Sequence, residues 1–139
     1  MKIREFQNYI VERLNGVEAL VQGGCKAFAE DTREVYDEAN QHLAGGKLAI
    51  VVVTPEFERA GSGEPNGLPA EASLVIRCVE CAPLSREDPT VIRALDAAEI
   101  VAHELDGELL EWKSIRQTSE ERERALIATV TFGFDIILN

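Results

Sequence analysis

Two hydrophobic periods alternate along the chain, and the clearest example lies between Ala72 and Gly107. Residues 72–81 are nearly all apolar, with Arg77 and Glu80 as the exceptions, which predicts a strand. After a short proline-bearing loop, apolar residues recur every three to four positions, which predicts a helix whose alanine-rich face packs closely on a sheet. That face comprises Val91, Ala94, Leu95, Ala98, Val101, Ala102 and Leu105.

The ends of this helix carry typical capping residues. Asp88 is a candidate N-cap, and Pro89 would occupy the first helical position, where no amide hydrogen bond is lost. Gly107 is a candidate left-handed C-cap. These signals predict a helix that runs from residue 89 to residue 106.

The C-terminal third predicts two more strands around the charged turn 118–124. In residues 109–117, Trp112 should point to one face and Ile115 to the other, because successive side chains alternate. The last strand has the most regular alternation in the chain, which is typical of a sheet with one face packed on helices. Its apolar face comprises Leu126, Ala128, Val130, Phe132, Phe134, Ile136 and Leu138.

The N-terminal half predicts two helices and two extended segments. Residues 3–14 repeat as an amphipathic helix, and residues 31–43 begin with a capping box of Asp31 and Glu34. Residues 17–30 favour one extended segment kinked at Gly23-Gly24. A helix over Val17, Leu20, Val21 and Phe28 is the weaker alternative, because both glycines would lie inside it. The β-branched run 48–53 predicts a buried strand that ends at Thr54-Pro55.

The order of these elements predicts a single α+β domain over residues 1–139. We expect a mixed or antiparallel sheet of about four to five strands, with three helices packed mainly on one face. The length of the chain and its 45% hydrophobic content suit one core.

A long glycine- and proline-rich loop is expected at about residues 54–70. Loops of this length inside a compact domain are usually functional or disordered. Two interpretations stay open: an arm that orders against a neighbouring subunit, or a flexible connection. Under the first, the candidate assembly residues are Glu58, Arg59, Gly61, Gly63, Glu64, Asn66 and Gly67.

The formal net charge of -11 argues against nucleic acid as a direct partner, because phosphates are repelled and no basic stripe offsets this. No run of about 18 apolar residues is present, so no membrane span is predicted. The N-terminal residues lack the apolar region of a signal peptide, which favours a protein kept in the cytoplasm or carried in a particle assembled there.

The search for chemistry gives no catalytic, metal-binding or cofactor-binding motif, so we expect no cofactor and no enzymatic activity. Cys78 and Cys81 have the spacing of a zinc or redox half-site, but in a strand they face opposite sides. His42 and His103 lie on predicted helices without an orienting partner. The alternative is a small ligand-binding domain or enzyme with a pocket around Glu80, His103 and Trp112.

Four segments in order carry a resemblance to a known family. They are the strand end Val51-Val52-Val53-Thr54-Pro55, the strand 74–80, the turn Pro83-Leu84-Ser85-Arg86 and the helix 94–107 that closes on Leu105-Asp106-Gly107, followed by the alternating hairpin. This arrangement resembles small minor tail proteins of long-tailed bacteriophages and prophages, of the tail completion or tail terminator type. Where such proteins often carry Asn before the arginine of the turn, this chain has Ser85.

The resemblance implies a structural role. Such subunits form a ring, often a hexamer, at the head-proximal end of the tail tube, where the ring stops tube growth and contacts head-completion proteins. For this chain it implies a virion tail component assembled in the bacterial cytoplasm, with copies of itself and other tail or head proteins as partners. The turn residues Glu80, Ser85 and Arg86 are then candidate interface residues.

Overall fold

The computed structural model describes residues 3–30, 33–61, 67–81, 84–107, 109–122 and 124–138, apart from the side chains of residues 33–36 and 85. Its order is α1 (Ile3–Asn15), α2 (Glu18–Gln22), β1 (Cys25–Ala29), α3 (Arg33–Ala44), β2 (Leu48–Val52), β3 (Glu56–Arg59), β4 (Leu68–Cys81), α4 (Leu84–Glu87), α5 (Ala94–Leu105), β5 (Glu111–Glu120) and β6 (Ala125–Leu138). The predicted α+β class is confirmed.

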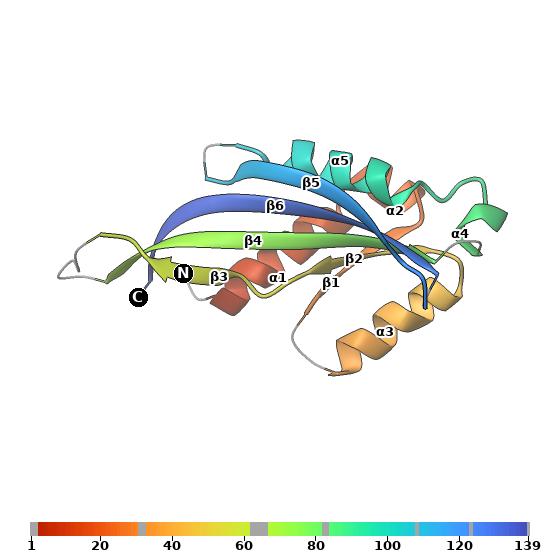
Figure 1. Ribbon diagram of the computed structural model, residues 1–139, viewed down its shortest axis with the longest axis horizontal. Coiled ribbons are helices and arrows are strands. Elements are labelled where there is room, and N and C mark those ends of the chain that lie inside the picture. The colour runs from red at the N-terminus through yellow and green to blue at the C-terminus, as the bar shows by residue number, and fades with distance from the viewer. Residues whose placement is uncertain are drawn as a thin grey trace.

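The strands form one six-stranded sheet in the order β1-β2-β4-β6-β5, with β3 beside β4. Only the β1–β2 pair is parallel, so the sheet is mixed, as predicted, with one strand more than expected. β4 and β6 pair without a break from Leu68↔Leu138 to Cys81↔Ala125 and run the length of the molecule (Figure 1).

The stretch 54–70, expected as a loop, contains a strand that the sequence pattern did not reveal. β2 pairs with the second half of β4 and β3 with its first half, so both lie along the same edge of β4. The chain departs from the ladder at Thr54-Pro55, where proline has no amide to donate. Between β3 and β4 only residues 60–67 connect the strands, and residues 62–66 lie outside the described part.

Helices cover both faces of the sheet, although most lie on one (Figure 1). The main core packs α1, α2 and α5 against Leu74, Ile76 and Cys78 of β4 and their neighbours on the other strands. α3 packs on the opposite face, where Ala39 and Leu43 meet Phe28 and Ala49. The prediction of helices mainly on one face therefore holds, with α3 as the exception.

The start of α5 was predicted wrongly. Asp88 accepts hydrogen bonds from the amide and hydroxyl of Thr90 and closes a turn, so it does not cap a helix. The short helix α4 precedes this turn, and α5 begins only at Ala94. There the carboxylate of Glu80 accepts a hydrogen bond from the Ala94 amide at 3.3 Å, and Arg93 lies 4.0 Å from the same carboxylate. Glu80 is 1% exposed, so it is an internal cap and not a surface residue.

Three further expectations need correction. Residues 17–30 form α2 and β1, because Gly24 at φ +75° turns the chain between them. Gly107 is not left-handed, and Asp106 caps α5 in an extended conformation. Trp112 and Ile115 lie on the same face, because a bulge between Trp112 and Ser114 shifts the alternation by one residue.

Three strands lie at edges of the sheet, because β1, β3 and β5 each pair with one described strand. The edges at β1 and β5 differ in how far they are covered. At β1, the side-chain amide of Asn15 accepts a hydrogen bond from the Ala27 amide at 2.8 Å and donates to the Ala27 carbonyl at 3.1 Å. This side chain occupies the edge that another strand would need. β5 forms the opposite edge and is exposed along almost its whole length.

Replacing Glu80 with Ala should destabilise the fold by about 1–3 kcal/mol, because it removes a buried acceptor from the first turn of α5. Urea unfolding of Glu80→Ala and of the wild type measures the difference. Glu80→Gln keeps an acceptor oxygen and should lose less. Equal stability of the wild type and Glu80→Ala would contradict the capping role.

Candidate assembly surfaces

The long strands extend beyond the helices and form an arm, which we define as β3, residues 67–73 of β4 and residues 133–138 of β6 (Figure 1). The start of α1 supports its base, since the rings of Phe6 and Phe134 lie 4.9 Å apart and Phe57 meets Phe134 edge-on at 6.4 Å. Beyond this aromatic group the sheet continues without a helix from the described residues.

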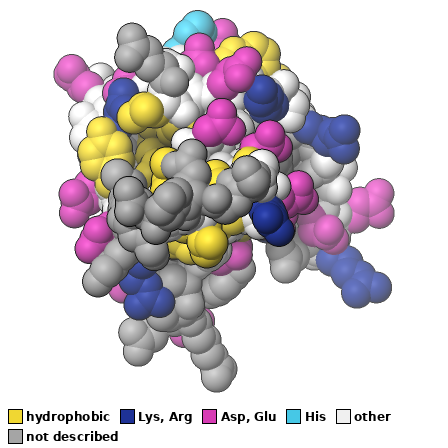
Figure 2. Space-filling model, turned by 90° about the vertical axis from the view of Figure 1, so that its left-hand side faces the viewer, with side chains coloured by type: hydrophobic (Ala, Val, Ile, Leu, Met, Phe, Trp, Pro, Cys, Tyr) yellow, Lys and Arg dark blue, Asp and Glu magenta, His cyan; other side chains and the backbone are white. Residues whose placement is uncertain are grey.

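The end of the arm is apolar. Leu68 is 65% exposed and Ile137 is 48% exposed. A groove of about 460 Å³ lies on this end and is lined by Phe57, Glu58, Arg59, Leu68, Pro69, Ala70 and Leu138. Figure 2 looks onto this end and shows hydrophobic side chains exposed on it. We call the set Phe57, Arg59, Leu68 and Leu138 the arm tip.

The predicted loop residues lie at or next to the arm tip where they are described. Glu58 and Arg59 are exposed in β3, and the Arg59 Nε donates to the Gly61 carbonyl at 3.2 Å. Gly61 has φ +72°, which favours glycine. Gly67 has no room for a side chain, since a Cβ there would meet the Leu138 carbonyl oxygen at 2.8 Å. Gly63, Glu64 and Asn66 lie outside the described residues.

The opposite face of the arm carries a row of carboxylates next to Pro69 and Ile137. Glu58 pairs with Glu71, and Glu71 pairs with Asp135, so three exposed carboxylates follow one another across the strands. Like charges directly opposite each other repel. This row has no sequence signal of its own, because its members are far apart in the chain.

A second hollow, the α5–β5 groove, runs between the last helix and the edge strand. It has a volume of about 560 Å³ and is lined by Leu95, Glu99, Ala102, His103, Asp106, Trp112 and Ile115. Leu95 and Trp112 are 47% and 48% exposed, so large apolar groups face solvent here. The predicted helix face placed Leu95 toward the sheet, and the structure places it in this groove instead. The Asp106 carboxylate accepts a hydrogen bond from the Trp112 amide at 3.2 Å.

The remaining candidates do not meet in one place. His103 and Trp112 share the α5–β5 groove, but Glu80 is buried at the other end of α5, so the predicted pocket of all three residues does not form. Arg86 is exposed on α4, and Ser85 lies on the same short helix. Within the described part of the chain, no group of three or more metal-ligating side chains occurs and no helix is long and apolar enough to cross a membrane.

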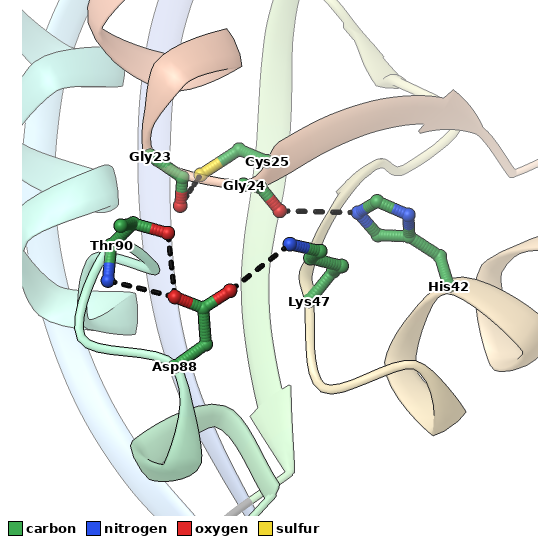
Figure 3. A network of polar contacts seen from close by, with 7 residues as sticks. All are labelled: Gly23, Gly24, Cys25, His42, Lys47, Asp88 and Thr90. Carbon is green, nitrogen blue, oxygen red and sulfur yellow. Dashed lines mark hydrogen bonds and ion pairs between the residues drawn. The ribbon is translucent and has the colours of Figure 1, made fainter.

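A polar network joins three connections at the far end of the sheet (Figure 3). The Asp88 carboxylate accepts from the Thr90 hydroxyl at 2.6 Å, from the Thr90 amide at 3.0 Å and from the Lys47 ammonium at 3.3 Å. These hydrogen bonds from Thr90, and then from Lys47, lower the pKa of Asp88 to about 2.

His42 belongs to the same region and is a structural histidine. Its Nε2 lies 3.2 Å from the Gly24 carbonyl, and its ring meets Phe28 edge-on. Burial lowers its pKa. Burial also raises the pKa of the Cys25 thiol to about 12, which keeps this sulfur protonated and unreactive. The network therefore fixes loops and offers no nucleophile.

Comparisons with known proteins find a similarity in structure and none in sequence. No protein-family model matches the chain, and no curated protein matches it in sequence. Its structure is similar to a chain of a solved structure described as "Virion of native gene transfer agent (GTA) particle", with a TM-score of 0.60 and 15% sequence identity. The similarity covers 97% of this chain and 97% of that one, so the two share their fold over nearly their full lengths.

Asp88→Asn should be less stable than the wild type at neutral pH, because the ionised carboxylate receives three hydrogen bonds in the folded state. The pKa of Asp88 falls from an ordinary 3.8 to about 2 on folding. Its contribution is therefore fully present above about pH 4 and is lost as the pH falls through about 2.

Thermal unfolding of both proteins between about pH 2 and pH 7 checks this, with a difference expected to shrink below about pH 4. The same comparison in a Thr90→Val background is the control, since it removes the hydroxyl donor and should reduce the pH-dependent part. A difference that stays constant down to about pH 2 would show that the network does not hold Asp88 ionised.

Proposed function

We propose that this protein is a structural subunit of a phage-like particle, and that it acts as a tail completion or tail terminator subunit. In this role, copies of the chain form a closed ring at the end of a tail tube, stop its growth and contact head-completion proteins. The observation that carries the proposal is the shared fold, over 97% of both chains, with a component of a solved virion.

The surface of the chain supports a role in protein–protein contacts. The arm exposes large apolar side chains that a single subunit leaves in water, which is typical of an assembly surface. The edge at β1 is covered by Asn15 and the edge at β5 is open, so these two edges are not equivalent. Contacts between unlike surfaces of identical subunits generate rings or filaments.

A small-ligand-binding role is the second candidate, and the α5–β5 groove is the observation that favours it. Its volume of about 560 Å³ and its mixture of Trp112, His103 and acidic side chains are typical of ligand pockets. Against it, the groove is open along the edge strand and its described polar groups do not converge with buried Glu80.

The tail terminator role predicts that the protein forms a ring and that it shortens tail tubes. Native mass spectrometry and light scattering of the purified protein should show a single oligomer whose mass is a multiple of the 15.3 kDa subunit, or such a ring should appear when the protein is added to tail tubes. Tube subunits polymerised in its presence should give shorter tubes capped at one end, measured by electron microscopy.

Tubes of unchanged length, with no ring in solution or on tube ends, would refute the terminator role. Heat-unfolded protein added at the same concentration is the control for non-specific effects on polymerisation.

A further inference from the structure

We infer that the arm tip of one subunit docks into the α5–β5 groove of a second copy of this chain. The inference rests on the proposed ring and names the two surfaces that would build it. It makes the contact head-to-tail, with each subunit giving its arm to one neighbour and its groove to the other.

The arm tip exposes apolar side chains outside the helix layer, and a partner that covered them would remove this surface from water. Leu68 is 65% exposed, and Leu138 and Phe57 are half-buried beside it. β3 pairs with β4, and β4 pairs with β6. These ladders fix the backbone of the tip, so it is a preformed projection. Burial of such side chains stabilises a contact by roughly 25 cal/mol for each Å² of apolar area removed from water.

The groove has the matching composition. Leu95, Ala102, Trp112 and Ile115 give it an apolar lining, and Leu95 and Trp112 are about half exposed. Glu99 and Asp106 add carboxylates beside this lining. Tryptophan is one of the residue types enriched at binding hot spots, and Trp112 lines this groove.

Charge selects this pairing over others. The subunit has a net charge of -11, so two copies repel unless the local charges are opposite. Arg59 is the one basic residue among the described residues of the arm, and it lines the tip beside Leu68 and Leu138. The groove offers Glu99 and Asp106 to that guanidinium.

A subunit cannot fill its own groove with its own arm. Trp112 pairs with Phe132, whereas the tip ends at Leu138, about 20 Å further along the same strand. β6 runs through both regions and holds them apart. The groove of one copy must therefore receive the arm of another, and this heterologous contact closes into a ring or continues as a filament.

Two charge-introducing variants test the contact separately. Leu68→Asp blocks the tip and Leu95→Asp blocks the groove, and both side chains are exposed enough for the fold to survive the change. Each variant alone should lose at least about tenfold in self-association and remain monomeric by sedimentation. Val21→Asp changes a side chain that is 54% exposed on α2, outside both surfaces, and should assemble like the wild type.

Mixing the two variants gives the decisive result. Leu68→Asp still has a groove and Leu95→Asp still has an arm, so an equimolar mixture should form heterodimers and no ring. Native mass spectrometry distinguishes the heterodimer when one variant is isotope-labelled. A mixture that stays monomeric, or single variants that still form rings, would overturn the docking. Circular dichroism of each variant checks that the fold is kept.

A charge exchange tests the ionic part of the contact. Arg59→Glu and Glu99→Arg should each weaken association, and the double variant should recover it, because the same pair is restored with reversed charges. No recovery would overturn the assignment of Arg59 to the groove.

Other occupants of these surfaces appear as distinct results. If the variants form rings but no longer shorten tubes, the arm binds the tube, which overturns this inference and leaves the proposed function standing. If the wild type never associates with itself at any concentration, in solution or on tubes, the docking is wrong. The tube-length assay then decides the proposed function by itself.

Discussion

The uninterrupted pairing of β4 with β6 is the constraint from which the rest of the structure follows. Fourteen residues in each strand span about 46 Å, whereas the twelve residues of α5 span about 18 Å. A helix layer of that length cannot cover a ladder of this length. The core face of the sheet is therefore buried under α1 and α5 near its middle, and its apolar side chains become exposed only toward the end of the arm, where Leu68 is 65% exposed. One strand pair gives the molecule both its core and its exposed surface.

The sequence predicted the elements whose burial is set by local periodicity. Val130 and Phe132 in β6, and Ala98 and Val101 in α5, recur with the strand and helix periods and are fully buried. β3 was missed because only Phe57 of its four residues is apolar, and it is a strand because the first half of β4 is there to pair with it. Local pattern cannot report a pairing that depends on a partner far along the chain.

The errors around α5 have the same origin. Asp88 and Pro89 have the residue types of a helix start. However, the Asp88 carboxylate accepts hydrogen bonds from Lys47 and Thr90, so it does not cap a helix. The group that does cap α5 is Glu80, 14 residues earlier and on another element. The bulge after Trp112, which puts Trp112 and Ile115 on the same face of β5, was also missed, because a one-residue shift leaves the alternation plausible on both faces. For residues 54–70 an assembly arm was one of two interpretations left open. The apolar arm tip and the α5–β5 groove depend on the three-dimensional register.

The acidic row on the arm explains why one face of the arm, and not the other, is suited to a copy of the same chain. Glu58, Glu71 and Asp135 repel one another across the strands, and a second acidic subunit placed on them would add to that repulsion. The opposite face carries Arg59 among apolar side chains. Because side chains alternate along β3, Glu58 and Arg59 must point to opposite faces, so one four-residue strand separates a repelling surface from an attracting one. In the proposed docking, apolar contact and opposite charge direct the face that carries Arg59 to a neighbouring subunit, and the carboxylate row stays outside that contact.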